Sequence, residues 1–167
     1  RDRSVSRGLG DVYKRQEGNH SGGYQRRCKM EESVKTEQVN AYQYSPLALA
    51  YMGDSILDLL VKKYFVTHSN MQPHKYHVEV SKIVKAVNQA DYIDQIMEEL
   101  SEDELDVYKR GRNTNTHSKA KNATMGQYRK ATGLEALYGY LYLKGDMERL
   151  QYFVNGMIKQ YLAGKEQ

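Results

Sequence analysis

The sequence has one cysteine and no long apolar run, and these shortages exclude several classes of protein. The single cysteine, Cys28, allows neither an internal disulfide nor a thiolate metal cluster, which fits a reducing compartment such as a bacterial cytoplasm. No apolar run reaches the roughly 20 residues of a membrane-spanning helix, so no membrane partner is expected. At 167 residues the chain has the length of one domain with a single core.

Several catalytic motifs are absent as well. The sequence contains no HExxH pattern, which argues against zinc, and no GxxxxGK[ST] or GxGxxG pattern, which argues against a nucleotide-binding enzyme. It also lacks GxSxG, which argues against a serine hydrolase.

The first 29 residues differ in composition from the rest of the chain. They are rich in Gly, Ser and Arg without apolar periodicity, and the substring GLGDVYKRQ resembles a translated sequencing adaptor. We therefore expect Met30 to be the true start, residues 1–29 to be a disordered or artefactual leader, and residues 30–167 to form one domain. The leader holds eight of the 25 Lys and Arg side chains but only three of the 21 Asp and Glu side chains, so the remainder is close to neutral. The isoelectric point near 9.0 is therefore no indication of nucleic-acid binding.

Apolar spacing predicts helices through nearly all of residues 30–167 and no strand with a period of two, so the expected fold is all-α. Ser45 and Pro46 form an N-cap and first-turn pair that opens a helix to about Phe65. Pro73 opens a second helical region, in which we expect a break near Asn88.

Capping residues mark the later helices. Ser101 and Glu104 form a capping box for a short helix that we expect to end at Gly111. The following long helix is expected to end at Gly145, where Asp146 caps a last amphipathic helix.

Two of the most apolar stretches, residues 47–61 and 131–143, carry only three charges, and all three are the carboxylates of Asp54, Asp58 and Glu135. Desolvation penalises an ionised acid in an apolar helix until a cation or a hydrogen bond compensates. If both helices pack in one core, a metal ion is the natural partner, because carboxylate oxygens are the ligands that Mg²⁺ prefers.

Each acid also has a structural interpretation. Asp54 could bond to a neighbouring backbone where Gly53 permits a tight helix crossing, and Glu135 could pair with an arginine of the basic segment described next. For Asp58 the structural interpretation is favoured, with a place at the solvent edge and Lys62 as its partner one turn later.

Charge is segregated between two neighbouring segments. Residues 91–106 contain eight acids and no base, whereas residues 109–130 contain seven bases and no acid. The basic segment includes a polar loop expected at residues 112–125, and the guanidinium groups of Arg112 and Arg129 suit phosphate oxygens. The segment is equally well explained as a solvated loop that balances the acidic segment beside it.

The motifs, taken in order, resemble those of the ribonuclease III family. LALAYMGDSILDLLV at residues 47–61 is similar to the family's signature helix, and ATGLEALYGYLYLKGD at residues 131–146 is similar to its second catalytic helix. RGRN at residues 110–113, KN at residues 121–122 and YRKATGLEAL at residues 128–137 are similar more narrowly to the family's mini form, which consists of the catalytic domain alone.

The resemblance implies a fold, an activity and partners. The implied fold is the all-α ribonuclease III endonuclease domain as a homodimer, without a separate double-stranded-RNA-binding domain. The implied activity is cleavage of double-stranded RNA with Mg²⁺, for which Mn²⁺ can substitute, in maturation of 23S ribosomal RNA precursor in the cytoplasm. A ribosomal protein is a further candidate partner on that precursor. The alternative is a ribonuclease-III-like module that binds RNA or a ribosomal component without cleaving it.

The resemblance also implies roles for individual residues. Asp54 and Glu135 match the family's catalytic, metal-binding carboxylates. Ala50 and Thr132 replace two further carboxylates of the long family members, so fewer protein ligands are expected for the metal, and Asp58 is a candidate outer-shell helper. The candidate RNA-binding residues are Arg110, Arg112, Asn113, Lys119, Lys121, Asn122 and Arg129.

Overall fold

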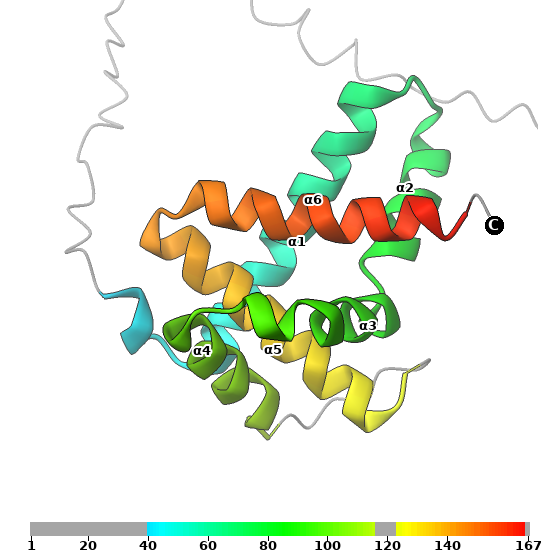
Figure 1. Cartoon of the computed structure of the whole chain (residues 1–167). Coiled ribbons are helices and arrows are strands. Elements are labelled where there is room, and N and C mark those ends of the chain that lie inside the picture. Colours follow the sequence, from blue (N-terminus) through cyan, green and yellow to red (C-terminus); the bar gives the residue numbers. More distant parts are fainter. Residues whose placement is uncertain (1–39, 116–122, 166–167) are drawn as a thin grey trace, which may run out of the picture. The chain divides into compact units, whose positions relative to one another are not determined.

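The computed structural model describes residues 40–115 and 123–165, and every regular element in these ranges is a helix. The all-α expectation is thereby confirmed. The 3₁₀ helices are η2 (Ala41–Gln43) and η3 (Met97–Glu99), and the α-helices are α1 (Pro46–His68), α2 (Pro73–Ile83), α3 (Ala86–Ile96), α4 (Glu102–Asn113), α5 (Met125–Lys144) and α6 (Met147–Ala163) (Figure 1). Residues 1–29 and Met30 lie outside the described ranges, so the predicted leader and start stay predictions.

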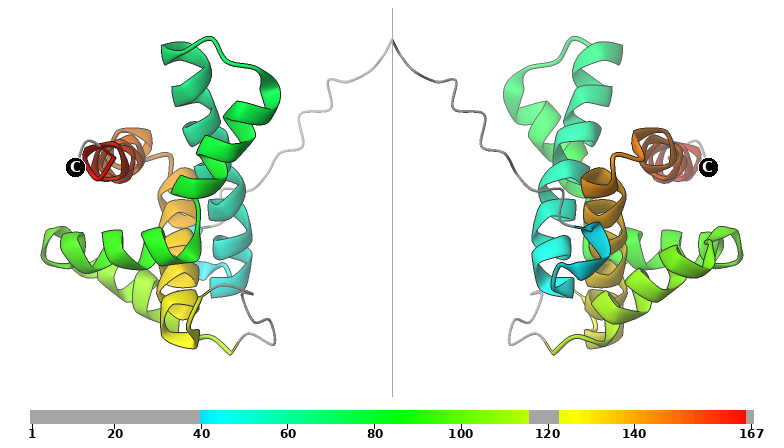
Figure 2. Two further views of the ribbon diagram at one scale, coloured as in Figure 1. Left: turned by 90° about the vertical axis from the view of Figure 1, so that its right-hand side faces the viewer. Right: turned by 90° about the vertical axis from the view of Figure 1, so that its left-hand side faces the viewer.

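Helix α5 occupies the centre of this fold. It lies between α1 on one side and the α3–α4 pair on the other (Figure 2). Its side chains Leu134, Leu137, Tyr138 and Leu141 are almost completely buried, as expected of a helix that is apolar around most of its circumference. Helix α6 follows through a turn at Gly145 and packs against α1 and α3. None of the helices in the described ranges is long and apolar enough to cross a bilayer.

The predicted helix starts are confirmed. The Ser45 side chain accepts a hydrogen bond from the backbone N–H of Ala48 at 3.2 Å, and Asp146 likewise caps α6. Both halves of the capping box formed by Ser101 and Glu104 are present. Helix α1 ends at His68, a little beyond the expected Phe65. These starts are local signals, because the capping bond joins residues only three positions apart.

The break between α2 and α3 lies at Val84 and Lys85, one turn before the expected position near Asn88. The Asn88 amide donates to the backbone oxygen of Lys82 at 2.5 Å, and the Gln89 amide donates to that of Val84 at 3.1 Å. These bonds satisfy carbonyl groups that the end of α2 leaves without intrahelical partners. Asn88 therefore stabilises the break from the start of the next helix.

Helix α4 continues through Gly111 and ends at Asn113, which corrects the predicted end. A Cβ on Gly111 would lie 2.7 Å from the Cβ of Ala136 in α5. Gly111 is therefore a packing residue inside the helix and not its C-cap. As a result, Arg112 and Asn113 belong to α4 and not to the expected polar loop.

Candidate active site

Helices α1 and α5 cross at a glycine contact that positions the two predicted catalytic acids. A Cβ on Gly53 would lie 1.7 Å from the backbone oxygen of Glu135, and a Cβ on Gly139 would lie 2.0 Å from that of Leu49. Only glycine fits at these points, because Cβ atoms do not approach other heavy atoms so closely. Asp54 directly follows Gly53, so the crossing fixes the backbone that carries both acids.

Both acids have raised pKa values, and the charge of Asp54 acts on Glu135. Asp54 lies at the surface, yet partial desolvation raises the pKa of its carboxyl, and the negative charge of Asp58 raises it further. Burial raises the pKa of Glu135 to about 7, a hydrogen bond from Gln89 opposes the rise, and the charge of Asp54 adds to it. Carboxylates whose pKa values are raised together are typical of functional sites.

Within the described ranges, no cationic side chain forms an ion pair with Asp54 or Glu135. The interpretation that pairs Glu135 with an arginine is thus not supported there, and its partner is the Gln89 amide, 2.9 Å from Oε1. The side-chain hydrogen bonds of this part of α1 involve Ser55 and Asp58, not Asp54. Two neighbouring carboxylates without a cation suit a divalent ion, which would offset both the desolvation and the repulsion.

The two positions that lack a carboxylate are buried beside the site. Ala50 and Thr132 each expose 6 % of their surface, and Thr132 Oγ1 donates to the backbone oxygen of Tyr128 at 3.1 Å. Neither side chain offers an anionic ligand. In the part of the chain that the structure describes, no group of three or more His, Cys, Asp or Glu side chains is placed to hold a metal ion.

Asp58 occupies the surface position that the sequence favours. Its carboxylate pairs with Lys62 at 2.5 Å, and both side chains are substantially exposed. Such a pair contributes little to stability. Asp58 affects Asp54 through its charge, not through a hydrogen bond.

The basic residues fall into distinct environments. The Arg110 guanidinium donates to the backbone oxygens of Tyr42 and Tyr44, at 3.0 and 3.2 Å, and stacks on the Tyr42 ring. Arg112 is half-buried and donates to the Asn113 side chain at 3.1 Å. Arg129 is exposed on the second turn of α5. Three candidate RNA-binding residues lie outside the described residues: Lys119, Lys121 and Asn122.

One basic residue supports the charge-balance interpretation. Lys130 pairs with Asp94 of the acidic segment at 2.5 Å. Arg112 and Arg129 form no such ion pair within the described ranges. The acidic segment thus compensates part of the basic segment and leaves both guanidinium groups without an acidic partner there.

Sequence reasoning missed Gln89, and it identified Glu104 only as a capping residue, not as a buried partner of Arg149. Gln89 is 1 % exposed and bonds to Glu135, and Glu104 is 6 % exposed and bonds to Arg149 through both carboxylate oxygens, at 2.9 and 3.0 Å. Gln89 precedes the buried residue Ile93 by four positions and so lies on the apolar face of α3. A polar side chain at that spacing is the signal that identifies it in the sequence.

Comparisons with known proteins match the sequence that carries this site to a family. The model of the ribonuclease III domain matches residues 47–146, which include both acids and the helices that carry them. The chain is 42 % identical over 116 residues to the mini-ribonuclease 3 of Staphylococcus aureus, covering 68 % of this chain and 87 % of that protein. It is 41 % identical over 116 residues to the mini-ribonuclease 3 of Streptococcus pneumoniae, covering 68 % and 91 %.

A solved structure shares the fold of this chain. A crystal structure of a Fusobacterium nucleatum protein superposes with a TM-score of 0.65 at 30 % sequence identity, covering 71 % of this chain and 95 % of that one. The family model covers more than half of the chain, and the relatives match nearly their whole length. The chain therefore belongs to the ribonuclease III family, in its mini-ribonuclease III group.

Proposed function

We propose that Asp54 and Glu135 hold the Mg²⁺ ion with which this protein hydrolyses phosphodiester bonds of double-stranded RNA. Endoribonuclease activity on double-stranded RNA accompanies membership of the ribonuclease III family, whereas the residues, the metal and the natural substrate are our proposal. The observation that carries it is the pair of carboxylates with raised pKa values at the α1–α5 crossing, without a cationic partner in the described ranges.

The chemistry follows from the placement of the two acids. When bound, Mg²⁺ supplies a Lewis acid that polarises the phosphodiester and lowers the pKa of a water molecule. Asp54 is exposed and therefore open to a large substrate, while the partly buried Glu135 is held from within the core by the Gln89 amide. Asp54 and Glu135 would hold the ion through two carboxylates, which would leave coordination positions for water and for substrate oxygens.

We place the RNA along the N-terminal part of α5 and the C-terminal end of α4. Arg129 precedes Glu135 by six residues on the same helix, which is about 9 Å along its axis. Arg112 and Asn113 lie at the last turn of α4, and Lys119, Lys121 and Asn122 fall between the two helices in the sequence. Phosphate and 2′-hydroxyl contacts of this kind recognise duplex RNA by shape. Of the predicted contacts Arg110 is the weakest, because its guanidinium already holds two backbone oxygens.

A homodimer and a ribosomal substrate complete the proposal. Helix α1 exposes a stripe of large apolar side chains beside Asp54, with Tyr51 at 76 %, Leu59 at 59 % and Val66 at 60 % exposure. A second copy of the chain is the partner that we propose for this stripe, since a two-fold axis would set two sites against opposite strands. We propose 23S ribosomal RNA precursor as the substrate and the cytoplasm as the location. Sedimentation of Tyr51→Lys should show a monomer where the parent is a dimer.

Cleavage of duplex RNA by the full chain tests the catalytic assignment. Asp54→Asn and Glu135→Gln should each reduce the rate at saturating Mg²⁺ by at least two orders of magnitude, a size typical of lost electrostatic stabilisation. Glu148→Gln, which neutralises an exposed carboxylate in the first turn of α6, is the control and should stay within a few-fold of the parent. Cleavage by Asp54→Asn at the parental rate would remove that residue from the mechanism, and binding without cleavage by the parent would favour the non-catalytic module.

Salt dependence of binding tests the RNA surface. If about three cations neutralise phosphates in each protomer, the logarithm of affinity should fall with the logarithm of salt concentration with a slope of roughly two to three. Arg112→Ala should lower that slope by about one. Lys159→Ala, an exposed lysine on α6, is the control and should leave the slope unchanged. An unchanged slope for Arg112→Ala would mean that RNA binds elsewhere.

A further inference from the structure

Gln89 links the helix break to the carboxylate pair. It lies in the first turn of α3, and only 1 % of its surface is exposed. Its Nε2 donates one hydrogen bond to the backbone oxygen of Val84 at 3.1 Å and one to Glu135 Oε1 at 2.9 Å. A single amide nitrogen thus joins the end of α2 to an acid of α5.

The chemistry of the two partners fixes the orientation of this amide. A backbone carbonyl and a carboxylate both accept hydrogen bonds and neither donates, so the NH₂ group must face them. Rotating the amide by half a turn would place its oxygen against two other oxygens. The Gln89 Oε1 atom is buried without a hydrogen-bond partner in the described ranges, so nothing there favours the reverse orientation.

The same contact distinguishes the two oxygens of Glu135. Oε1 accepts the Gln89 bond, whereas Oε2 accepts no side-chain or backbone bond within residues 40–115 and 123–165. Glu135 is partly exposed, and Oε2 is not one of the buried polar atoms that lack a partner. One oxygen is therefore held by the protein and the other remains available.

We infer that Gln89 is a positioning residue for the metal site: its amide holds Oε1 of Glu135 so that Oε2 is presented to the cation. The inference rests on the proposed function, because it takes Glu135 as a metal ligand. Bonds to a ligand from outside the coordination sphere orient that ligand and support metal affinity. Glutamine performs this task without adding a third negative charge next to Asp54 and Glu135.

The α2–α3 break explains why Gln89 can reach the acid. The Val84 carbonyl is left unpaired by the end of α2, and it holds the amide nitrogen from one side while Glu135 holds it from the other. Asn88, the preceding residue, secures the same break through Lys82. The position of the amide is therefore set by two elements besides its own helix.

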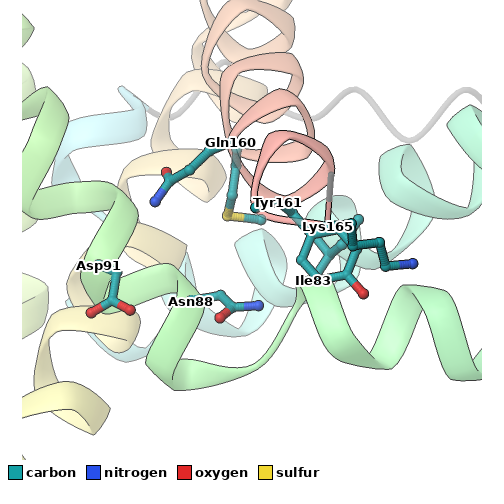
Figure 3. A pocket seen from close by; sticks show the side chains of 8 residues that line it. Ile83, Asn88, Asp91, Gln160, Tyr161 and Lys165 are labelled. Atoms are coloured by element: carbon teal, nitrogen blue, oxygen red, sulfur yellow. The ribbon is translucent and has the colours of Figure 1, made fainter. Parts of the chain in front are cut away.

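Gln160 offers a matched control for the loss of a buried amide. It lines a cavity of about 240 Å³ between α6 and α3, together with Asn88 and Asp91 (Figure 3). Its Oε1, like that of Gln89, is buried without a partner in the described ranges. No hydrogen bond joins Gln160 to either acid there, so Gln160→Met removes a comparable amide away from the site.

Calorimetric titration of Mn²⁺ into the full chain without RNA tests the inference. Gln89→Met keeps the size of the side chain and removes its donors, and it should weaken Mn²⁺ binding about 10- to 100-fold. Gln160→Met should stay within twofold of the parent. In cleavage assays the Mg²⁺ concentration for half-maximal rate should rise by the same factor for Gln89→Met, while KM for duplex RNA stays unchanged.

A second variant guards against loss of folding. Gln89→Asn keeps an amide that is too short to span both Val84 and Glu135, and it should weaken Mn²⁺ binding in the same direction with a thermal transition close to that of the parent. Mn²⁺ affinity within twofold of the parent for either folded variant would overturn the inference. Failure of the proposed function is a separate result, in which Mn²⁺ does not bind the parent or binds Asp54→Asn equally well.

Discussion

Replacing Glu135 with glutamine should stabilise the metal-free protein at high pH while abolishing its activity. Burial raises the pKa of Glu135 from an ordinary 4.5 to about 7, so ionising this carboxyl opposes folding when no cation is bound. Glutamine has nearly the same shape and still accepts the bond from Gln89, but it never ionises. The variant therefore removes the penalty and leaves the packing in place.

The sign and size of the effect follow from linkage. Between pH 4.5 and about 7 the folded protein binds more protons at Glu135 than the unfolded chain does, so stability falls as pH rises through this window. Each unit of pKa shift corresponds to about 1.4 kcal/mol, which gives a penalty of about 3 kcal/mol above pH 8. Below pH 4.5 the penalty disappears, because the carboxyl is neutral in both states.

Urea denaturation of the parent and Glu135→Gln, at pH 4.5 and pH 8 in EDTA, measures this penalty. The free energy of unfolding of the variant relative to the parent should rise by about 2–3 kcal/mol between the two pH values. Every other group titrates in both proteins and largely cancels in the difference. Added Mg²⁺ should stabilise the parent at pH 8 and leave the variant unchanged. A difference that does not change with pH would refute the reasoning.

Three further predictions concern the packing and the charges around the site. Gly53→Ala should destabilise the fold by about 3 kcal/mol or more in denaturant titrations, because its Cβ would meet the backbone of Glu135. Gly126→Ala is the control and should be neutral or slightly stabilising, because its Cβ would make only an ordinary contact with Thr124 Oγ1 at 3.9 Å. Arg149→Met should lower the free energy of unfolding at pH 7 by about 3–5 kcal/mol, because it leaves the buried carboxylate of Glu104 without a cation. Burial opposes ionisation of Glu104, but hydrogen bonds from Arg149 and Ser101 lower its pKa. The loss of stability should therefore shrink as acid protonates Glu104. Mn²⁺ affinity measured by calorimetry should fall as pH drops below about 7, because the ion then competes with a proton on Glu135; affinity that is independent of pH from 5 to 8 would contradict this.

The signals that sequence analysis interpreted correctly are local. The N-caps at Ser45 and Asp146 and the capping box at Ser101 each depend on a bond that spans three residues, and all are present. Asp58 and Lys62 are also near in sequence, and they pair as expected. Bonds of this kind are determined by spacing alone and need no knowledge of tertiary packing.

The signals that sequence analysis misplaced depend on contacts between helices. Glycine is typical of a helix end, yet at Gly111 the helix continues, and Ala136 of α5 packs against this glycine. A break was expected near Asn88, but it lies one turn earlier, and the Asn88 amide bonds back across it to the carbonyl of Lys82. Gln89 gains its importance only from Glu135, which is 46 positions away in the sequence. No local pattern encodes a partner at that distance.

The small number of carboxylates is consistent with the burial of the two positions that lack one. Ala50 and Thr132 are each 6 % exposed, so an acid at either position would add a buried charge beside two carboxyls whose pKa values are already raised. The α1–α5 crossing tolerates the two charges it has because Asp54 reaches the surface and the amide of Gln89 supports Glu135. The neutral amide of Gln89 thus orients Glu135 without adding charge repulsion. The free-energy penalty of placing two carboxylates side by side in the metal-free protein therefore stays small enough for the fold to form.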